Sequence, residues 1–249
     1  MQYLFLFIIP FTILAQSGYD IAKMVDNRPM PNDLSNHAKM VLTNSKGKSR
    51  YQTMLSKSID QNKKQIIWFL EPKDDRGISF LKIQYKNKDD VMRMWLPAFK
   101  RVRRISAKKR GDAFMGSDLS YEDLSSRELT ENEYRRIDDD NISGVECYVI
   151  EIIPNEEIKS FYQKHISWID KTNFTILQEH SFNRKGELEK KKEYRYTLIK
   201  EYQIIDRIFV TNNIKNHTTE VIFSNIEVDN GIEDALFKEK SLKYLPYLK

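Results

Sequence analysis

The side chains best suited to catalytic chemistry are few and widely spaced in this sequence of 249 residues. Its four histidines, His37, His165, His180 and His217, stand apart, and none lies at metal-ligand spacing from another. There is no His-Glu-x-x-His pair, no Gly-x-Ser-x-Gly turn and no glycine-rich phosphate loop. We therefore predict no catalytic residue, no metal site and no cofactor, although Asp, Glu and Ser side chains from distant strands could still assemble into a site.

The densest charge in the sequence is basic. Residues 100–110, "KRVRRISAKKR", hold seven positive side chains and no negative one. Such a run can neutralise phosphates on nucleic acid or anionic lipid. Residues 117–140, with nine acidic against three basic residues, could instead neutralise the basic run within the fold. A further alternative is that the basic residues simply form the solvated face of a strand. We predict contact with lipid headgroups or a partner, and no nucleic acid. The candidates are Arg101, Arg103, Arg104, Lys108 and Lys109.

Large apolar residues flank the basic run on both sides, in "MWLPAF" before it and "FMGSDLSYEDL" after it. Phe114 and Met115 precede Gly116, a predicted tight turn, and a short helix with Leu119 and Tyr121 follows. A helix this short is stable only when it packs on another element. The segment is therefore either ordinary core or a flap over an apolar cavity, where methionine supplies an adaptable surface.

The first 17 residues, "MQYLFLFIIPFTILAQS", carry no charged side chain and predict a secretory signal peptide. Cleavage is expected before Gly18, or before Gln16 if Ala15 precedes the cut, which leaves residues 18–249 as a single domain. The lone Cys147 is predicted to be a small buried hydrophobe. An exported chain without disulfides or a lipid-attachment cysteine fits the bacterial periplasm. Three Asn-x-Ser/Thr triplets keep a eukaryotic secreted protein open as an alternative.

The remaining sequence predicts a mainly β domain. A helix is expected over residues 18–28, and from about residue 37 the apolar pattern has the period of two that is typical of strands. About a dozen strands joined by tight polar turns indicate an antiparallel meander. Two more short helices are expected over residues 117–126 and 130–137. A meander this long has to curl or close, which places the helices over its mouth or concave face. Asp20 is the expected N-cap of the first helix, and Thr130 with Glu133 the expected capping box of the last.

The alternation within strands predicts which residues share a face. Leu81 and Ile83 lie on one face of their strand, and Met92 and Met94 on one face of the next. Because a short turn makes these strands neighbours, all four are predicted to line one cavity. In the first hairpin the alternating residues are Ala38, Met40 and Leu42, followed after a turn by Tyr51, Thr53 and Leu55.

The stretch "WLPAFKRVRRISAKKRGDAFMGSDLSYEDL" closely resembles the signature of outer-membrane lipoprotein-sorting proteins, the LolA-like group. The upstream "FLEPKDDRGISFL" and the C-terminal "ALFKEKSLKYLP" are similar to that group as well, so the resemblance covers essentially the whole mature chain. It implies an incomplete antiparallel β-barrel, or strongly curved sheet, with short helices as a lid over a hydrophobic cavity that binds acyl chains. No position matches the lid-locking arginine of the well-studied carriers with certainty.

The resulting expectation is a periplasmic carrier, not an enzyme, that binds lipoprotein acyl chains or another lipid and delivers it toward the outer membrane. An inner-membrane lipid exporter or an outer-membrane acceptor is the expected partner. The first alternative is a binding or sensing module of the same fold that engages a partner protein; the second is a hydrolase. The cavity and lid candidates are Trp68, Leu81, Ile83, Met92, Met94, Leu96, Phe99, Phe114, Met115, Leu119 and Tyr121.

Overall fold

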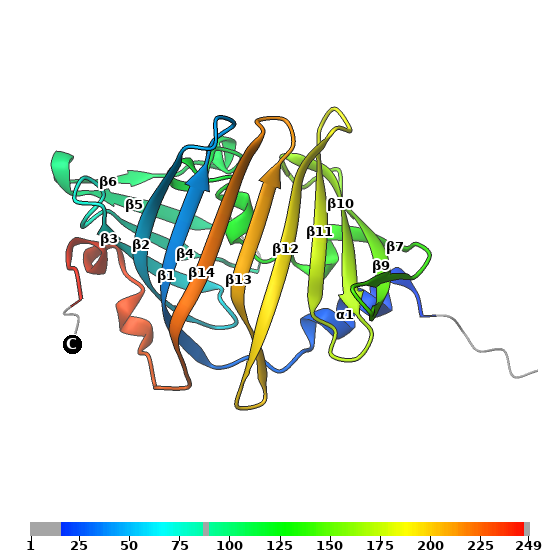
Figure 1. Ribbon diagram of the computed structural model, residues 1–249. Coiled ribbons are helices and arrows are strands. Elements are labelled where there is room, and N and C mark those ends of the chain that lie inside the picture. The colour runs from blue at the N-terminus through cyan, green and yellow to red at the C-terminus, as the bar shows by residue number, and fades with distance from the viewer. Residues whose placement is uncertain (1–15, 87–89, 247–249) are drawn as a thin grey trace, which may run out of the picture.

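The structure is a computed structural model that describes residues 16–86 and 90–246. The predicted signal peptide lies outside these residues except for Gln16 and Ser17. All described strands belong to one antiparallel sheet, and β1 and β14, far apart in sequence, pair near its middle (Figure 1). The sheet is thus two meanders joined at that pair. The first meander contains β1 (Asp33–Thr43), β2 (Ser49–Ile59), β3 (Lys64–Glu71), β4 (Ser79–Ile83), β5 (Val91–Leu96) and β6 (Arg101–Arg104).

The second meander runs from the far edge of the sheet back to its middle. In space its order from that edge is β7, β9, β10, β11, β12, β13 and β14, and β8 pairs with β9 beside this path. Because β6 and β7 do not pair with each other in the described residues, the sheet is strongly curved but open, as predicted for an incomplete barrel. The strands are β7 (Asn132–Arg136), β8 (Asp140–Ile142), β9 (Val145–Pro154), β10 (Tyr162–Asp170), β11 (Ile176–Asn183), β12 (Leu188–Ile199), β13 (Tyr202–Asn212) and β14 (His217–Val228).

The predicted N-terminal helix is confirmed as α1 (Gly18–Asp26), with a correction to its cap. Ser17 is the N-cap and Asp20 is its partner three residues later, so the two side chains form a reciprocal capping box. The helix packs Ile21 and Ala22 against β9 and β10 near the edge of the sheet. No described helix is long and apolar enough to cross a membrane.

The two short helices predicted further along the chain are wrong. Residues 117–126 contain only a single 3-10 turn, because Asp118 and Ser120 bond to Thr219 and Asp123 instead of supporting a helix. Residues 130–137 are mostly β7, since pairing with β9 overrides the local helix signal. The 3-10 turns are η1 (Pro97–Phe99), η2 (Ala107–Lys109), η3 (Phe114–Gly116), η4 (Glu122–Leu124), η5 (Leu129–Glu131), η6 (Asp234–Leu236) and η7 (Glu239–Lys243).

Irregular chain covers the concave face of the sheet, where the sequence predicted a lid of short helices. Residues 105–131, here called the inner segment, connect β6 to β7 through loops and 3-10 turns and pack on the concave face of the sheet. Figure 1 shows this segment in green behind the central strands. The concave face is therefore covered from within by the connection between the two meanders.

The convex face of β3, β4 and β5 carries a second apolar cluster. Trp68 and Leu81 are buried there under Phe237 and Leu242 of the C-terminal segment. In the register of the β4–β5 pair, Phe80 lies opposite Met94 and Lys82 opposite Met92. Residues opposite each other share a face, so Leu81 and Ile83 lie on the other side of the sheet from Met92 and Met94. The prediction that all four line one cavity is therefore wrong, because the register of this hairpin is offset by one residue from the apolar pattern.

Candidate functional site

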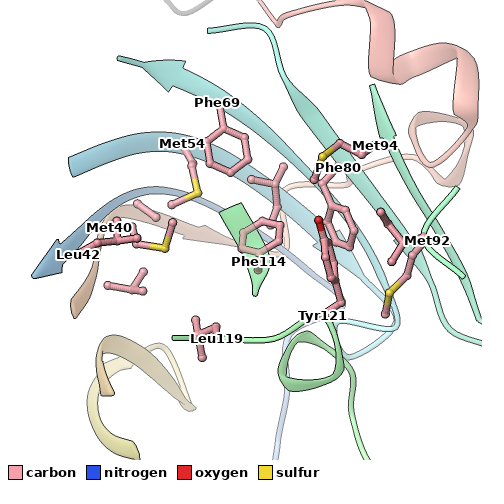
Figure 2. Close-up of a cluster of buried hydrophobic side chains, with 14 of the residues drawn as sticks. Met40, Leu42, Met54, Phe69, Phe80, Met92, Met94, Phe114, Leu119 and Tyr121 are labelled. Atoms are coloured by element: carbon pink, nitrogen blue, oxygen red, sulfur yellow. The ribbon is translucent and has the colours of Figure 1, made fainter. Parts of the chain in front are cut away.

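The inner segment is held to the first meander by an aromatic cluster. The Phe114 ring centre lies 5.3 Å from that of Phe80, 5.9 Å from that of Phe69 and 5.7 Å from that of Tyr121. Figure 2 shows Phe114 enclosed by these rings and by Met54 and its neighbours on the sheet. Edge-on ring contacts of this kind add to the stabilisation from burial alone. This cluster fixes the position of the inner segment over β1 to β5.

Beside this cluster lies a cavity of about 320 Å³, here called the apolar cavity. It is bounded by β1, β2, β3, β13 and β14 and by the inner segment. Its size is at the lower end of the range for small-molecule sites in proteins. The apolar side chains that line it are Met30, Pro31, Leu34, Ala38, Met40, Met54, Ile59, Ile67, Phe114, Leu119, Leu124, Ile204, Ile205, Ile208, Val221 and Phe223.

One wall of the apolar cavity is polar. Asn36, Ser56, Ser58 and Gln65 come from β1, β2 and β3 and lie next to one another in the strand register. In β2 the alternating buried residues are thus Gln52, Met54, Ser56 and Ser58, followed by Ile59 at the strand end, and not the set Tyr51, Thr53 and Leu55 in which the sequence shows alternation. Because this face of β2 carries polar as well as apolar residues, the sequence shows no apolar alternation that would identify it as buried.

The concave face of β10, β11 and β12 has an entirely different character, because it carries a buried ion network. Asp123 of the inner segment accepts hydrogen bonds from Lys190 Nζ at 2.9 Å and from Lys192 Nζ at 2.5 Å. Lys192 also bonds to Glu179 at 3.1 Å, and Glu179 in turn pairs with Arg127. The side chains of Asp123, Lys190, Lys192 and Glu179 are at most 5% exposed.

The charges of this network stabilise one another. Burial alone would raise the pKa of the Asp123 carboxyl, but the Lys192 and Lys190 ammonium groups hold it well below its ordinary value. Burial would likewise raise the pKa of Glu179, and Arg127 and Lys192 lower it. Lys192 shows the converse: burial would lower its pKa, and Asp123 and Glu179 raise it well above its ordinary value. All three groups are therefore charged at neutral pH.

A histidine and a serine adjoin the network, so we considered hydrolytic chemistry. Ser181 Oγ lies 2.9 Å from His165 Nδ1, and Glu179 Oε1 lies 3.6 Å from the same nitrogen. A Ser-His-acid relay requires the serine and the acid on opposite ring nitrogens. Ser181 is also completely buried, and burial together with Arg127 lowers the pKa of His165 well below its ordinary value. This geometry is that of a neutral, buried polar contact and does not support nucleophilic catalysis.

Lys82 of β4 anchors the inner segment to the first meander. Its ammonium group is fully buried and donates a hydrogen bond to the Leu124 carbonyl at 2.5 Å. Next to it, Gln84 makes two hydrogen bonds to the backbone of Ser126, at 2.5 and 3.0 Å. Burial lowers the pKa of Lys82 to about 8, although the Asp90 carboxylate opposes this. Together with Asp123, these contacts fix residues 123–126 to the sheet.

The structure distributes the predicted cavity and lid residues over four environments. Phe114 and Leu119 line the apolar cavity. The exposed Phe99 lies at the β6 edge of the sheet, 67% accessible. Three residues pack on the convex face in the second cluster, namely Trp68, Leu81 and Ile83. Five belong to the concave core without lining the cavity: Met92, Met94, Leu96, Met115 and Tyr121.

The basic candidates lie at the same edge as Phe99. Residues 101–104 form β6, the exposed strand that the sequence predicts, and Lys108 and Lys109 belong to the following turn η2. The Arg101 guanidinium lies 5.4 Å from the centre of the Phe99 ring. The five basic side chains are exposed, and none of them lines the apolar cavity.

Most of the cavity wall was missed from the sequence. The missed residues come mainly from β1, β2, β13 and β14, which are distant in sequence from the motif that indicated a lipid site. The ion network was missed too, although "EKKKEYRY" in β12 places Lys190, Lys192 and Tyr194 at alternating positions, so that they share one face. In sequence such a strand is indistinguishable from one with a solvated face.

Comparisons with known proteins agree with this architecture. A family model described as an uncharacterized protein matches residues 61–244. No curated protein is similar enough to count as a match. A solved structure from Vibrio parahaemolyticus, described as an outer membrane lipoprotein-sorting protein domain, is 30% identical with a TM-score of 0.86, over 91% of this chain and 98% of that one.

Two further solved structures are similar over nearly their whole length. A DUF1329 family protein from Desulfovibrio piger is 28% identical with a TM-score of 0.86, over 90% of this chain and 97% of that one. A LolA superfamily protein from Nitrosomonas europaea shares the fold with a TM-score of 0.72 at 16% identity, over 91% of this chain and 99% of that one. With the open curved sheet and its inner segment, these similarities show that the chain belongs to the LolA-like family of outer membrane lipoprotein-sorting proteins.

Proposed function

We propose that this protein is a periplasmic carrier that binds an acyl chain of a lipoprotein, or of another lipid, in the apolar cavity and delivers it toward the outer membrane. The observation that carries the proposal is the cavity of about 320 Å³, walled mainly by aliphatic side chains and present in a fold of the lipoprotein-sorting family. No catalytic group is required of such a protein. Binding and release of an apolar chain are sufficient.

The physical driving force suits this role. Each methylene transferred from water into an apolar cavity contributes about 0.8 kcal/mol. Several methylenes are therefore enough for useful affinity after the cost of immobilising the ligand. A carrier also has to release its ligand, and the mixture of apolar and polar wall keeps the gain below that of a fully apolar site.

Export is part of the proposal, and the start of the described chain bears on where cleavage occurs. The Ser17 side chain caps α1, and the Gln16 carbonyl accepts a hydrogen bond from Arg136 at 3.2 Å. Cleavage before Gly18 would remove both contacts, whereas cleavage after Ala15 would keep them. We therefore expect Gln16 as the mature N-terminus, which the intact mass of periplasmic protein measures.

The basic edge is proposed as the part that meets lipid headgroups or a membrane surface. An exposed aromatic ring, Phe99, lies beside Arg101 and the other exposed basic side chains of β6 and η2. Basic groups attract anionic lipid surfaces, and an aromatic ring is favourable at a membrane interface. This edge is distinct from the cavity, so loading and membrane contact can be tested separately.

The test of the carrier proposal is native mass spectrometry of gently purified protein together with uptake of a fluorescent fatty acid. Wild type is expected to retain lipid and to bind the probe. Ala38→Phe places a ring in the cavity and should reduce probe affinity at least about tenfold by excluding the chain. Lys39→Phe, on the exposed face of the same strand, is the matched control and should bind like wild type.

A wild-type protein that neither retains lipid nor binds the probe would contradict the carrier proposal. The chain would then be better explained as a binding or sensing module for a partner protein. Equal loss of binding in Ala38→Phe and Lys39→Phe would show that the probe binds elsewhere on the surface.

A further inference from the structure

The polar wall of the apolar cavity contains hydrogen-bonding atoms that the described residues leave unused. Asn36 is 7% exposed, and its Oδ1 atom is buried without a hydrogen-bond partner. Gln65 Oε1 is buried without a partner in the same way. Buried polar atoms in folded proteins are nearly always paired, and leaving one unpaired is costly. Two such atoms on one wall of a cavity therefore indicate that its occupant supplies a polar group.

The local geometry fixes how this polar wall is presented. Gln65 Nε2 donates to Ser56 Oγ at 3.2 Å, which directs the amide and leaves its oxygen without a partner. Asn36 lies opposite Ser56 in the β1–β2 register and Gln65 reaches the same serine from β3, so the two amides flank Ser56 from either side of β2 on the concave face. Both belong to paired strands and not to a loop, although Asn36 stands at an irregularity in the β1–β14 pairing, and its pairing with β2 is regular.

The chemistry of the wall favours a neutral polar group over a charged one. Amides and serine hydroxyls provide hydrogen bonds but no countercharge. The two carboxylates on the lining are already bonded, Asp123 to Lys190 and Lys192 and Asp33 to backbone N–H groups of residues 230–232. The one guanidinium on the lining, that of Arg28, donates to the Val25 carbonyl. A hydroxyl group both donates and accepts, so it can pair with an amide whichever way its oxygen and nitrogen are turned.

We propose that the apolar cavity recognises an acyl chain that carries a hydroxyl group, which pairs with Asn36 and Gln65. This inference rests on the proposed carrier function and names the class of lipid more closely. An unsubstituted chain fills the same space but leaves both amide oxygens unpaired. The cavity therefore discriminates between chains of equal length by their hydroxyl group.

The test compares stearic acid with hydroxystearic acids that differ only in the position of the hydroxyl, from near the carboxyl group to the middle of the chain. Wild type should bind at least one hydroxylated isomer roughly fivefold or more tightly than stearic acid, as one buried hydrogen bond implies. Asn36→Leu and, separately, Gln65→Met should abolish this preference while stearic acid still binds. Thr53→Val, a polar-to-apolar change on the other face of β2, is the control and should keep it.

The outcomes separate this inference from the carrier function. If wild type binds all chains equally or prefers stearic acid, the inference fails and the carrier function stands; ordered water alone then pairs with the two amides. If the preference persists in both Asn36→Leu and Gln65→Met, the hydroxyl is recognised elsewhere and the inference also fails. If wild type binds no chain at all, both proposals fail. Should one variant not fold, the other gives the same comparison.

Discussion

The two halves of the concave face hold the same inner segment by opposite physical means. Over β1 to β5 the contacts centre on the apolar cluster around Phe114, with Lys82 on β4 as a polar anchor, and over β10 to β12 they are ionic and centre on Asp123. Apolar packing is not directional, so the first half tolerates an empty volume beside the ring. In the ionic half the carboxylates of Asp123 and Glu179 are already paired with cations.

This difference assigns separate tasks to the halves. The apolar half provides space for a ligand, and the ionic half positions the segment that bounds that space. A buried ion pair adds little stability compared with apolar packing, but the loss of one partner leaves a charge without compensation and is strongly destabilising. We therefore expect the ionic half to fail abruptly under mutation and the cavity wall to tolerate change.

The largest expected effect separates core from cavity wall within the apolar half. Met94 is 6% exposed and does not line the cavity, so Met94→Asp should destabilise the fold by about 5 kcal/mol or prevent folding. Ile208→Asp changes a partly buried residue of the cavity wall and should leave a folded protein that no longer binds the fatty-acid probe. Thermal melting and probe titration of both variants measure the contrast. Equal destabilisation would show that the wall is ordinary core.

Next in size is the loss of one charge from the ion network. Glu179→Gln leaves the buried Lys192 and the partly exposed Arg127 with less compensation, which should lower the free energy of unfolding by roughly 3–5 kcal/mol at neutral pH. Glu193→Gln, on the exposed face of the neighbouring strand β12, should change it by less than about 0.5 kcal/mol. Denaturant unfolding gives both values. A loss below about 1 kcal/mol for Glu179→Gln would mean that water, not Glu179, compensates the cations.

The network also predicts sensitivity to acid. The pKa values of Asp123 and Glu179 are held below their ordinary values in the folded protein. Their contribution to stability is therefore complete above the ordinary carboxyl pKa, near 4, and is lost as the pH falls below it. The acid transition of wild type should accordingly be steeper than that of Glu179→Gln.

A smaller effect at alkaline pH tests the Lys82 anchor. Burial lowers the pKa of Lys82 to about 8 from an ordinary value near 10.5, so between these values the unfolded chain binds more protons than the folded one. The contribution of Lys82 to the free energy of unfolding therefore rises between pH 8 and 10.5, by up to about 3 kcal/mol. Lys82→Met should lack the rise. The free energies of unfolding of wild type and variant are measured from pH 8 to 10.5 and subtracted. Tyrosine ionisation affects both proteins and cancels in this difference, which leaves the contribution of Lys82. A difference that stays constant with pH would contradict the lowered pKa of Lys82.

The smallest effect on stability is expected at the basic edge. Arg103→Glu with Arg104→Glu changes two exposed side chains and should leave the melting temperature nearly unchanged. Binding to anionic vesicles should fall at least about tenfold and lose its salt dependence, since each basic residue near such a surface contributes about 1 kcal/mol. Neutral vesicles provide the control. Unchanged binding to anionic vesicles would identify the edge as an ordinary solvated strand.

The sequence was sufficient for the fold and insufficient for most of the site. The strands, the N-terminal helix and the LolA-like resemblance all depend on local patterns, and these patterns are confirmed. The faces of β4 and β5 were predicted wrongly because the register of a hairpin is decided by its loop and by tertiary packing. The polar cavity wall around Asn36 and the Lys190 network escaped notice because buried and solvated polar residues have the same alternation.

The inner segment limits the volume of the apolar cavity. Phe114 and Leu119 belong to no strand, yet they occupy part of the trough that the curved sheet would otherwise offer along its whole length. Under the proposed carrier function, the length of acyl chain that fits is therefore set by a connecting segment and not by the paired strands. Connections accept substitutions that a paired strand does not. Under the same proposal, a different side chain at Phe114 or Leu119 would change the chain length that fits, with every strand pair left as it is.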